Sequence, residues 1–183
     1  MAALHIEDQV APKRCGHLSG HQLVPLGEFA GKIRAAVEAR RDPDLLIIAR
    51  TDAISAVGLD EALRRGEAAA RAGADVLFVE APRDEAQVEQ VARAFDVPLL
   101  YNYASGGRSP MLPFPRLRAL GYAIIILPVD TLLVATKAMA DYLAQVRARD
   151  DVQALATQGL PFTEFNALIG ATEQMALADR YQT

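Results

Sequence analysis

The stretch Leu45-Leu46-Ile47-Ile48-Ala49-Arg50-Thr51-Asp52 decides the fold, because five apolar residues run without interruption into a polar end. Continuous rather than alternating apolarity predicts a strand that is covered on both faces, as in a parallel sheet. The polar end marks the carboxyl edge of that sheet, where parallel α/β folds bind their ligands. The stretch therefore predicts both the fold class and the position of a site.

Strands and helices alternate along the whole chain around this stretch. A short run that ends in two acids predicts a strand at 4–8, and apolar runs predict strands at 76–79, 98–101 and 123–127. Apolar residues spaced by three and four predict helices at 26–40, 60–72, 84–95, 115–120, 131–149 and 162–178. Asp60 is expected to cap the second of these helices, and Pro161 precedes the last one. The alternation predicts parallel strands joined by right-handed crossovers.

The residues that end the strands distinguish a barrel from an open, doubly wound sheet. Nearly every strand ends in charged or amide side chains, which are Glu7 and Asp8, Arg50 and Asp52, Glu80, and Asn102. In a (β/α)8 barrel such ends converge on one mouth, whereas an open sheet spreads them along a line. We therefore expect an α/β fold of the (β/α)8 TIM-barrel type.

The predicted strands fall short of the eight that close a barrel. We expect residues 1–183 to form a single partial barrel domain of about five C-terminal βα units. Either N-terminal strands are missing, or a partner supplies them, or the sheet is open. The abrupt start of the first strand at Leu4 favours missing N-terminal strands.

The composition excludes several classes of protein. Apolar residues make up 51% of the chain and charged residues 23%, which indicates a globular protein. A net charge of -4 and a pI near 5.4 argue against binding to nucleic acid or to anionic membranes. No apolar run approaches the roughly 18 to 20 residues of a membrane span, and a signal-peptide pattern is lacking. One cysteine without an internal partner is typical of a reducing compartment, so a cytoplasmic location is expected.

That cysteine stands in the stretch Lys13-Arg14-Cys15-Gly16-His17. Neighbouring cations favour the thiolate, so the sulfur is suited to proton transfer or nucleophilic attack. Pro12 and the nearby glycines predict a loop rather than a buried position. The alternative is an inert loop thiol whose basic neighbours have no function.

Several motifs lie at or near the ends of the predicted strands: Ile6-Glu7-Asp8-Gln9, Lys13-Arg14-Cys15-Gly16-His17, Ala49-Arg50-Thr51-Asp52-Ala53, Phe78-Val79-Glu80-Ala81, and Asn102 with Gly106-Gly107-Arg108-Ser109-Pro110. Together they resemble the isocitrate lyase and phosphoenolpyruvate mutase superfamily. The cysteine loop looks closest to the methylisocitrate lyase and 2,3-dimethylmalate lyase branch. The resemblance implies a (β/α)8 barrel and a magnesium cofactor, with manganese as an alternative. It also implies reversible carbon-carbon cleavage of a 2-hydroxy di- or tricarboxylate to pyruvate and a second carboxylate.

The resemblance assigns catalysis to the cysteine loop. Cys15 would be the general acid that protonates the enediolate left after cleavage. Arg14 and His17 would stabilise the developing anion, although both could simply be solvated loop residues. Glu7 matches the glutamate that contributes to the family's metal site, so the resemblance assigns it to the metal.

The resemblance also assigns substrate contacts. Arg50 would bind a carboxylate through its planar fork, and the further contacts would be Glu80, Asn102, Gly16 and Ser109. Simpler interpretations stay open: Arg50 in an ion pair with Asp52 or Glu80, and the amide and hydroxyl groups as caps of strand ends and turns.

The sequence departs from the family pattern in two places. The paired aspartates that hold the metal would belong to a strand before residue 1, so the chain could be a catalytically inert fragment. Ser105 stands where relatives often carry glutamate, and Ser109 stands where they usually carry threonine. A phosphonate-branch mutase of the carboxyphosphonoenolpyruvate type is kept as an alternative, because the loops of that branch are similar. The resemblance further implies a homotetramer that exchanges a C-terminal helix at 161–183, although a helix folded on its own barrel fits as well.

Overall fold

The computed structural model describes residues 2–16 and 20–181. The chain divides into two compact units, Met1–Thr131 and Leu132–Thr183. The single domain expected over residues 1–183 stays a prediction.

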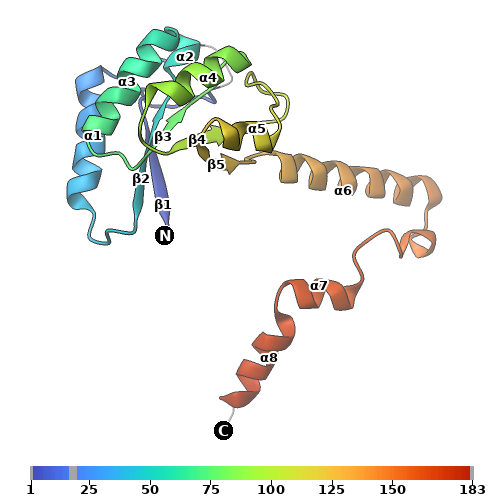
Figure 1. Ribbon diagram of the computed structural model, residues 1–183. Helices are drawn as coiled ribbons and strands as arrows, with labels where there is room; N and C mark the ends of the chain where they lie inside the picture. Colours follow the sequence, from blue (N-terminus) through green and yellow to red (C-terminus); the bar gives the residue numbers. More distant parts are fainter. Residues whose placement is uncertain (1, 17–19, 182–183) are drawn as a thin grey trace. The chain divides into compact units, whose positions relative to one another are not determined.

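The first unit alternates strands with helices (Figure 1). The strands are β1 (Ala3–Glu7), β2 (Leu46–Thr51), β3 (Val76–Val79), β4 (Leu99–Asn102) and β5 (Tyr122–Ile126). The helices are α1 (Leu26–Ala39), α2 (Ala53–Ala56), α3 (Leu59–Arg71), α4 (Glu85–Ala94) and α5 (Phe114–Ala119). The predicted strands are confirmed to within a residue or so at their ends, whereas the short helix α2 was not anticipated.

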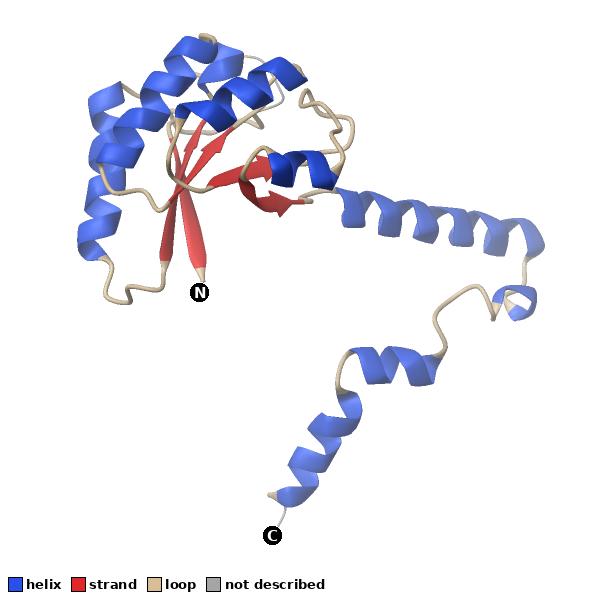
Figure 2. Ribbon diagram, viewed as in Figure 1, coloured by secondary structure: helices blue, strands red, loops and turns tan. Residues whose placement is uncertain are grey.

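The sheet has the topology of a barrel wall. All four strand pairings are parallel, and the spatial order β1-β2-β3-β4-β5 follows the chain. A doubly wound sheet would reverse its strand order at a switch point and carry helices on both faces. Figure 2 instead shows the helices of this unit gathered on one side of the strands. The α/β fold of barrel type is therefore confirmed, with five parallel strands present.

Strand alternation separates two apolar clusters on the two faces of the sheet. The face under the helices includes Ile47 and Leu77, packed with Phe29 and Ile33 of α1 and other helical residues. The opposite face carries a smaller cluster of Ile48, Val76, Phe78 and Leu100. Arg50 is two residues after Ile48 in β2 and so lies on the face away from the helices. The guanidinium of Arg50 is thus carried on the face that is opposite to the helix-covered cluster.

Two predicted helix features are wrong. Helix α3 begins at Leu59 after Gly58, whose φ of 130° suits glycine, so Asp60 lies in the first turn instead of capping it. The helix expected at 162–178, and hence the single C-terminal helix at 161–183, is broken in two. Gly170 adopts a left-handed φ of 67° between α7 (Phe162–Leu168) and α8 (Ala171–Arg180).

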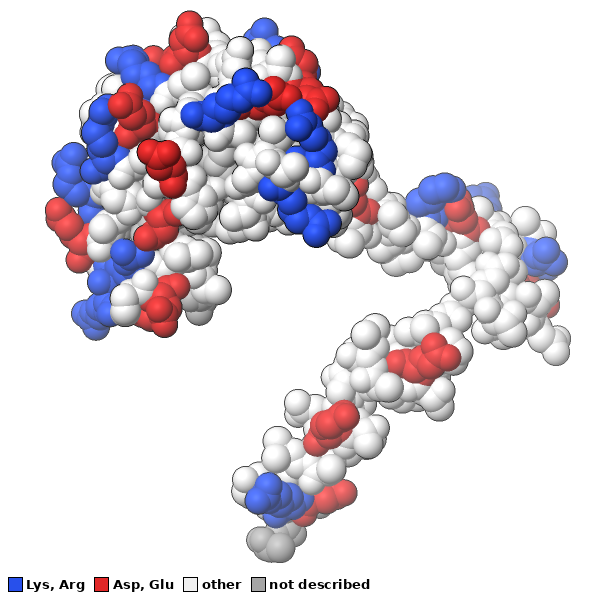
Figure 3. Space-filling model, viewed as in Figure 1, with Lys and Arg blue, Asp and Glu red and all other residues white. Residues whose placement is uncertain are grey.

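Helix α6 (Asp130–Arg149) begins at the end of the first unit, and the short 3-10 turn η1 (Gln153–Leu155) precedes α7. None of the helices in the described part of the chain is long and apolar enough to cross a membrane. Over the visible face of the first unit, basic and acidic side chains are interspersed (Figure 3).

Candidate active site

A cavity of about 450 Å³ lies at the carboxyl ends of the strands. It is lined by the ends of β2, β3 and β4 and by the loop that carries Cys15. The loop after β4 with Ser105, Gly106 and Gly107, here called the glycine loop, also contributes. Its lining includes Arg14, Cys15, Arg50, Glu80, Asn102 and Ser105. Residues far apart in the sequence therefore meet around one space, as expected for strands that point the same way.

Arg50 is the centre of the charged cluster in this cavity. Its Nη2 lies 2.9 Å from Asp52 Oδ1 and 3.7 Å from Glu80 Oε2, and its Nε lies 3.3 Å from Glu7 Oε2. The guanidinium also stacks 4.8 Å above the ring of Phe78. The ion pairs weighed from the sequence are thus present, and three carboxylates fix the orientation of one guanidinium.

Arg50 keeps its charge in this environment. Burial alone would lower its pKa, but hydrogen bonds to Asp52 and the charges of Glu80, Asp52 and Glu7 raise that pKa above its ordinary value. The guanidinium therefore offers a permanent positive charge to an anionic ligand.

Glu80 and Asn102 form a second polar pair in the cavity. Asn102 Nδ2 donates to both carboxylate oxygens of Glu80, at 3.1 and 3.2 Å. Asn102 Oδ1 is buried and has no hydrogen-bond partner among the described residues. A buried acceptor without a partner is costly, so this oxygen is suited to accept a hydrogen bond from a ligand hydroxyl.

Gly16 brings the cysteine loop directly onto this charged cluster. A Cβ at Gly16 would lie 2.5 Å from Glu80 Cγ and 2.8 Å from Arg50 Nη2, and it would also collide with Asp52 Oδ1. Only a residue without a side chain allows the backbone beside Cys15 to approach so closely.

Gly16→Ala is expected to lift the loop away from the cluster and to lower turnover about tenfold or more, because Cys15 is displaced from the cavity. The measurement is the steady-state rate of pyruvate release. Gly27→Ala is the matched control, since a Cβ there meets no atom within 4 Å. Equal rates for wild type and Gly16→Ala would contradict the close approach.

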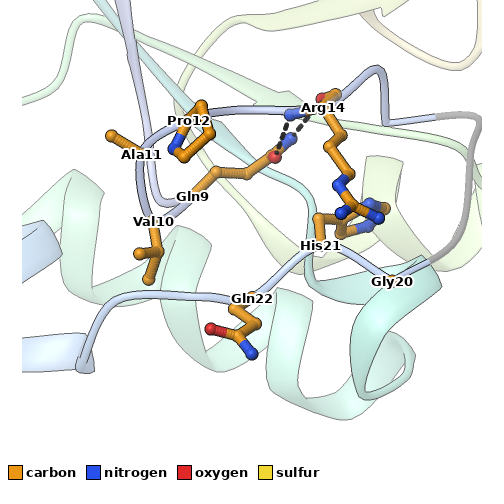
Figure 4. A pocket seen from close by; sticks show the side chains of 8 residues that line it. All are labelled: Gln9, Val10, Ala11, Pro12, Arg14, Gly20, His21 and Gln22. Atoms are coloured by element: carbon orange, nitrogen blue, oxygen red, sulfur yellow. Dashed lines mark hydrogen bonds between the residues drawn. The ribbon is translucent and has the colours of Figure 1, made fainter.

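The cysteine loop is fastened at its base by Gln9. The Gln9 side chain donates from Nε2 to Arg14 O at 2.8 Å and accepts from Arg14 N at 2.9 Å (Figure 4). The next residue, Cys15, is exposed and lines the cavity. The geometry thus presents the thiol to the cavity on a loop whose base is held by two hydrogen bonds.

Arg14 borders two spaces. It contributes to the main cavity, and it also lines a second cavity of about 220 Å³ with Gly20 and His21 (Figure 4). His21 lies 3.2 Å from Ser55 Oγ, and that hydroxyl donates to Gly16 O at 3.0 Å. Since Ser55 uses its proton on Gly16, His21 Nε2 is the donor in this chain of contacts, which supports the loop from behind.

Asp8 is a buried junction that sequence reasoning treated only as a strand end. Its carboxylate accepts from Thr51 Oγ1 at 2.6 Å, from Asp52 N at 2.9 Å and from Arg65 Nη1 at 3.2 Å. Burial raises the pKa of Asp8, and the hydrogen bonds and Arg65 oppose that rise only in part. This residue ties the end of β1 to the end of β2 and to α3.

Asp8→Ala is expected to lower the free energy of unfolding by about 3 to 5 kcal/mol, because it leaves Arg65 buried without this partner. Urea denaturation measures the change. Asp96→Ala, at an exposed position, is the control and should shift the free energy by about 0.5 kcal/mol or less. A similar small shift for Asp8→Ala would show that Asp8 does not anchor the site.

A family model described as phosphoenolpyruvate phosphomutase matches residues 1–147. The chain belongs to this family. Among its curated relatives, the 2,3-dimethylmalate lyase of Eubacterium barkeri is 41% identical over the whole chain, which covers 63% of that protein. The 2-methylisocitrate lyase of Bacillus subtilis is 44% identical over 75% of this chain and 45% of its own length. The chain thus spans less than two thirds of these family members.

Solved structures of family members agree. A 2,3-dimethylmalate lyase of the PEP mutase/isocitrate lyase superfamily aligns with a TM-score of 0.90 and 36% identity, over 99% of this chain and 60% of that chain. The structure of oxaloacetate acetylhydrolase with 3,3-difluorooxalacetate also aligns with a TM-score of 0.90. Its sequence identity is 34%, over 97% of this chain and 60% of that chain. The structure of phosphonopyruvate hydrolase in complex with oxalate and Mg²⁺ aligns with a TM-score of 0.85. Its sequence identity is 28%, over 100% of this chain and 63% of that chain. The superfamily predicted from the motifs is therefore confirmed.

The described residues of this chain do not by themselves form a complete magnesium site. Both oxygens of Glu7 take part in ion pairs, with Lys13 at 3.3 Å and with Arg50. Across residues 2–16 and 20–181, no three His, Cys, Asp or Glu side chains are grouped for a metal ion. Glu7 alone could contribute one carboxylate, and Mg²⁺ commonly uses one or two with several waters.

Three of the predicted site residues that the structure describes do not line the cavity, namely Glu7, Gly16 and Ser109. Ser109 is buried, and its hydroxyl has no hydrogen-bond partner in the described part of the chain. It lies beside Pro110, whose carbonyl accepts from Tyr101 Oη at 2.6 Å. His17 lies outside the described residues. The remaining members of the predicted set line the cavity.

Proposed function

We propose that this chain carries the cysteine and substrate-binding side of a carbon-carbon lyase site. The substrate would be a 2-hydroxy di- or tricarboxylate of the dimethylmalate or methylisocitrate type, and the products pyruvate and a second carboxylate. The observation that carries the proposal is the cavity in which Cys15, Arg50 and Asn102 meet at the strand ends. The 41% sequence identity to a 2,3-dimethylmalate lyase, which extends over the whole chain, supports this proposal.

The chemistry assigns a task to each of these groups. Cleavage breaks the hydroxyl O–H bond, whose proton passes to solvent water, and the neighbouring carbon-carbon bond, and it forms the carbonyl of the keto acid. The electron pair of the broken bond passes to the other fragment as an enediolate. Protonation of that carbon by Cys15 Sγ yields the second carboxylate and leaves a thiolate, which regains a proton before the next cycle.

Binding would rest on the buried polar groups. Arg50 would hold one substrate carboxylate, in an orientation that Glu7, Asp52 and Glu80 fix beforehand. Asn102 Oδ1 would accept from the substrate hydroxyl. Arg14, and His17 by resemblance, would stabilise negative charge near the thiol, while Gly16 allows the loop to close onto the cluster.

Magnesium, or manganese in its place, stays a prediction for this chain. Glu7 is the described carboxylate expected to contribute to such a site, and its remaining ligands would come from outside the described residues. Homo-oligomer formation through residues 161–183 and a cytoplasmic location also stay predictions.

The lyase is favoured over a phosphonate-branch mutase by degree of similarity. In one and the same comparison, the dimethylmalate and methylisocitrate lyases are 41% and 44% identical to this chain, whereas the carboxyvinyl-carboxyphosphonate phosphorylmutase of Arabidopsis thaliana is 36% identical over 98% of this chain.

An assay of the purified chain with Mg²⁺ tests the proposal. Pyruvate release from 2,3-dimethylmalate or 2-methylisocitrate is expected. Conversion of a phosphonate substrate without pyruvate release from either hydroxy acid would favour the mutase. No reaction with any of these substrates would favour the inert-fragment alternative.

A further inference from the structure

The glycine loop contains a polar pair that the proposed mechanism does not use. Ser105, which lines the main cavity, donates a hydrogen bond from its hydroxyl to Asp130 Oδ1 at the start of α6. Asp130 Oδ2 is buried and has no hydrogen-bond partner among the described residues. Both residues belong to the first compact unit. The cavity wall is therefore backed at this point by a carboxylate.

This contact determines what Ser105 can offer to a ligand. A hydroxyl has one proton and two acceptor lone pairs, and an ionised carboxylate can only accept. Because the proton of Ser105 is used on Asp130, its oxygen is left as an acceptor toward the cavity. Without Asp130, the same hydroxyl could donate to a substrate carboxylate.

A second acceptor lies nearby in the chain. Asn102, three residues before Ser105, lines the same cavity and has its Oδ1 unpartnered, while its amide protons are used on Glu80. This segment of the cavity wall thus offers two hydrogen-bond acceptors, Asn102 Oδ1 and Ser105 Oγ. The protons of these two side chains are used on the carboxylates of Glu80 and Asp130. Such a surface favours a hydrogen-bond donor and disfavours another anion.

We propose that the Ser105–Asp130 pair selects the substrate: it favours a hydroxy dicarboxylate and disfavours a tricarboxylate whose third carboxylate would face this wall. The inference rests on the proposed lyase function and narrows it to the dimethylmalate type. Ser105 is the contacting residue, and Asp130 is a positioning residue that orients its hydroxyl and places a carboxylate behind the wall.

The test compares 2,3-dimethylmalate with 2-methylisocitrate on wild type, Asp130→Asn, Asp130→Ala and Ser105→Ala. The wild type is expected to prefer the dicarboxylate in kcat/KM. Asp130→Asn removes the charge and Asp130→Ala also removes the acceptor, so both should lower this preference about tenfold. The change should come from a lower KM for the tricarboxylate, with kcat for the dicarboxylate nearly unchanged. Ser105→Ala removes the hydroxyl but leaves the carboxylate of Asp130 behind the wall, so the discrimination against the tricarboxylate should persist in this variant.

Calorimetric binding of the two acids provides a readout that does not depend on turnover. Asp141→Asn is the matched control on the same helix, because Asp141 is an exposed partner of Lys137, and it should change neither ratio. Thermal unfolding identifies any variant that fails to fold, and the remaining Asp130 variant then decides. A wild type that prefers the tricarboxylate, or an unchanged preference in the folded Asp130 variants, would overturn the inference. Wild type that neither binds nor cleaves either acid would instead refute the proposed function, and the inference with it.

Discussion

Cys15→Ser is expected to lower turnover by a factor of about 100 or more, because a serine hydroxyl is a much weaker acid than a thiol and would protonate the enediolate slowly. Pyruvate release at saturating substrate measures the effect. Since Cys15 is exposed, the substitution should leave the unfolding transition nearly unchanged, which separates a chemical effect from a folding defect.

Cys15→Ala provides the comparison for this result. Loss of the acid predicts that alanine is at least as damaging as serine. A turnover of Cys15→Ser equal to that of wild type would remove the thiol from the mechanism.

Arg50→Lys is expected to lower kcat/KM by about 100- to 1,000-fold, although the formal charge is kept. A lysine ammonium cannot reproduce the fork that reaches Asp52 through two nitrogens while also lying near Glu7 and Glu80. The substrate carboxylate would lose its fixed partner, and the carboxylates would lose the group that orients them.

The matched control for Arg50→Lys is Arg64→Lys. Arg64 pairs with Glu61 on the exposed side of α3, so its replacement should leave kcat/KM within about twofold of wild type. If Arg50→Lys were equally mild, Arg50 would be a structural ion-pair partner and not a ligand for substrate.

The order of strands was predictable because each buried strand is an apolar run with its own local signal. The polar residues after these runs also placed the site at one edge of the sheet, since parallel strands share that edge. The interruption of the predicted C-terminal helix was harder to predict. Nothing in the spacing of apolar residues at 162–178 marks Gly170 as a left-handed residue, because glycine is also tolerated inside helices at a modest cost.

The contacts that complete the site connect residues far apart in the chain. Asp8 meets Arg65 and Ser105 meets Asp130, and a periodicity argument contains no information about such pairs. Gly16 was expected as a substrate contact by resemblance, and its close approach to the charged cluster follows from the folded arrangement alone. Local patterns therefore predicted where the candidate site lies, and tertiary packing determined its polar partners.

Cys15 and Arg50 are expected to border one substrate cavity, and alkylation of the thiol tests this arrangement. Cys15 is the chain's single cysteine, so the mass added by iodoacetamide reports this residue alone. Saturating 2,3-dimethylmalate with Mg²⁺ is predicted to slow alkylation about tenfold in wild type, and to give little protection in Arg50→Lys. An alkylation rate that the hydroxy acid leaves unchanged in wild type would contradict the account.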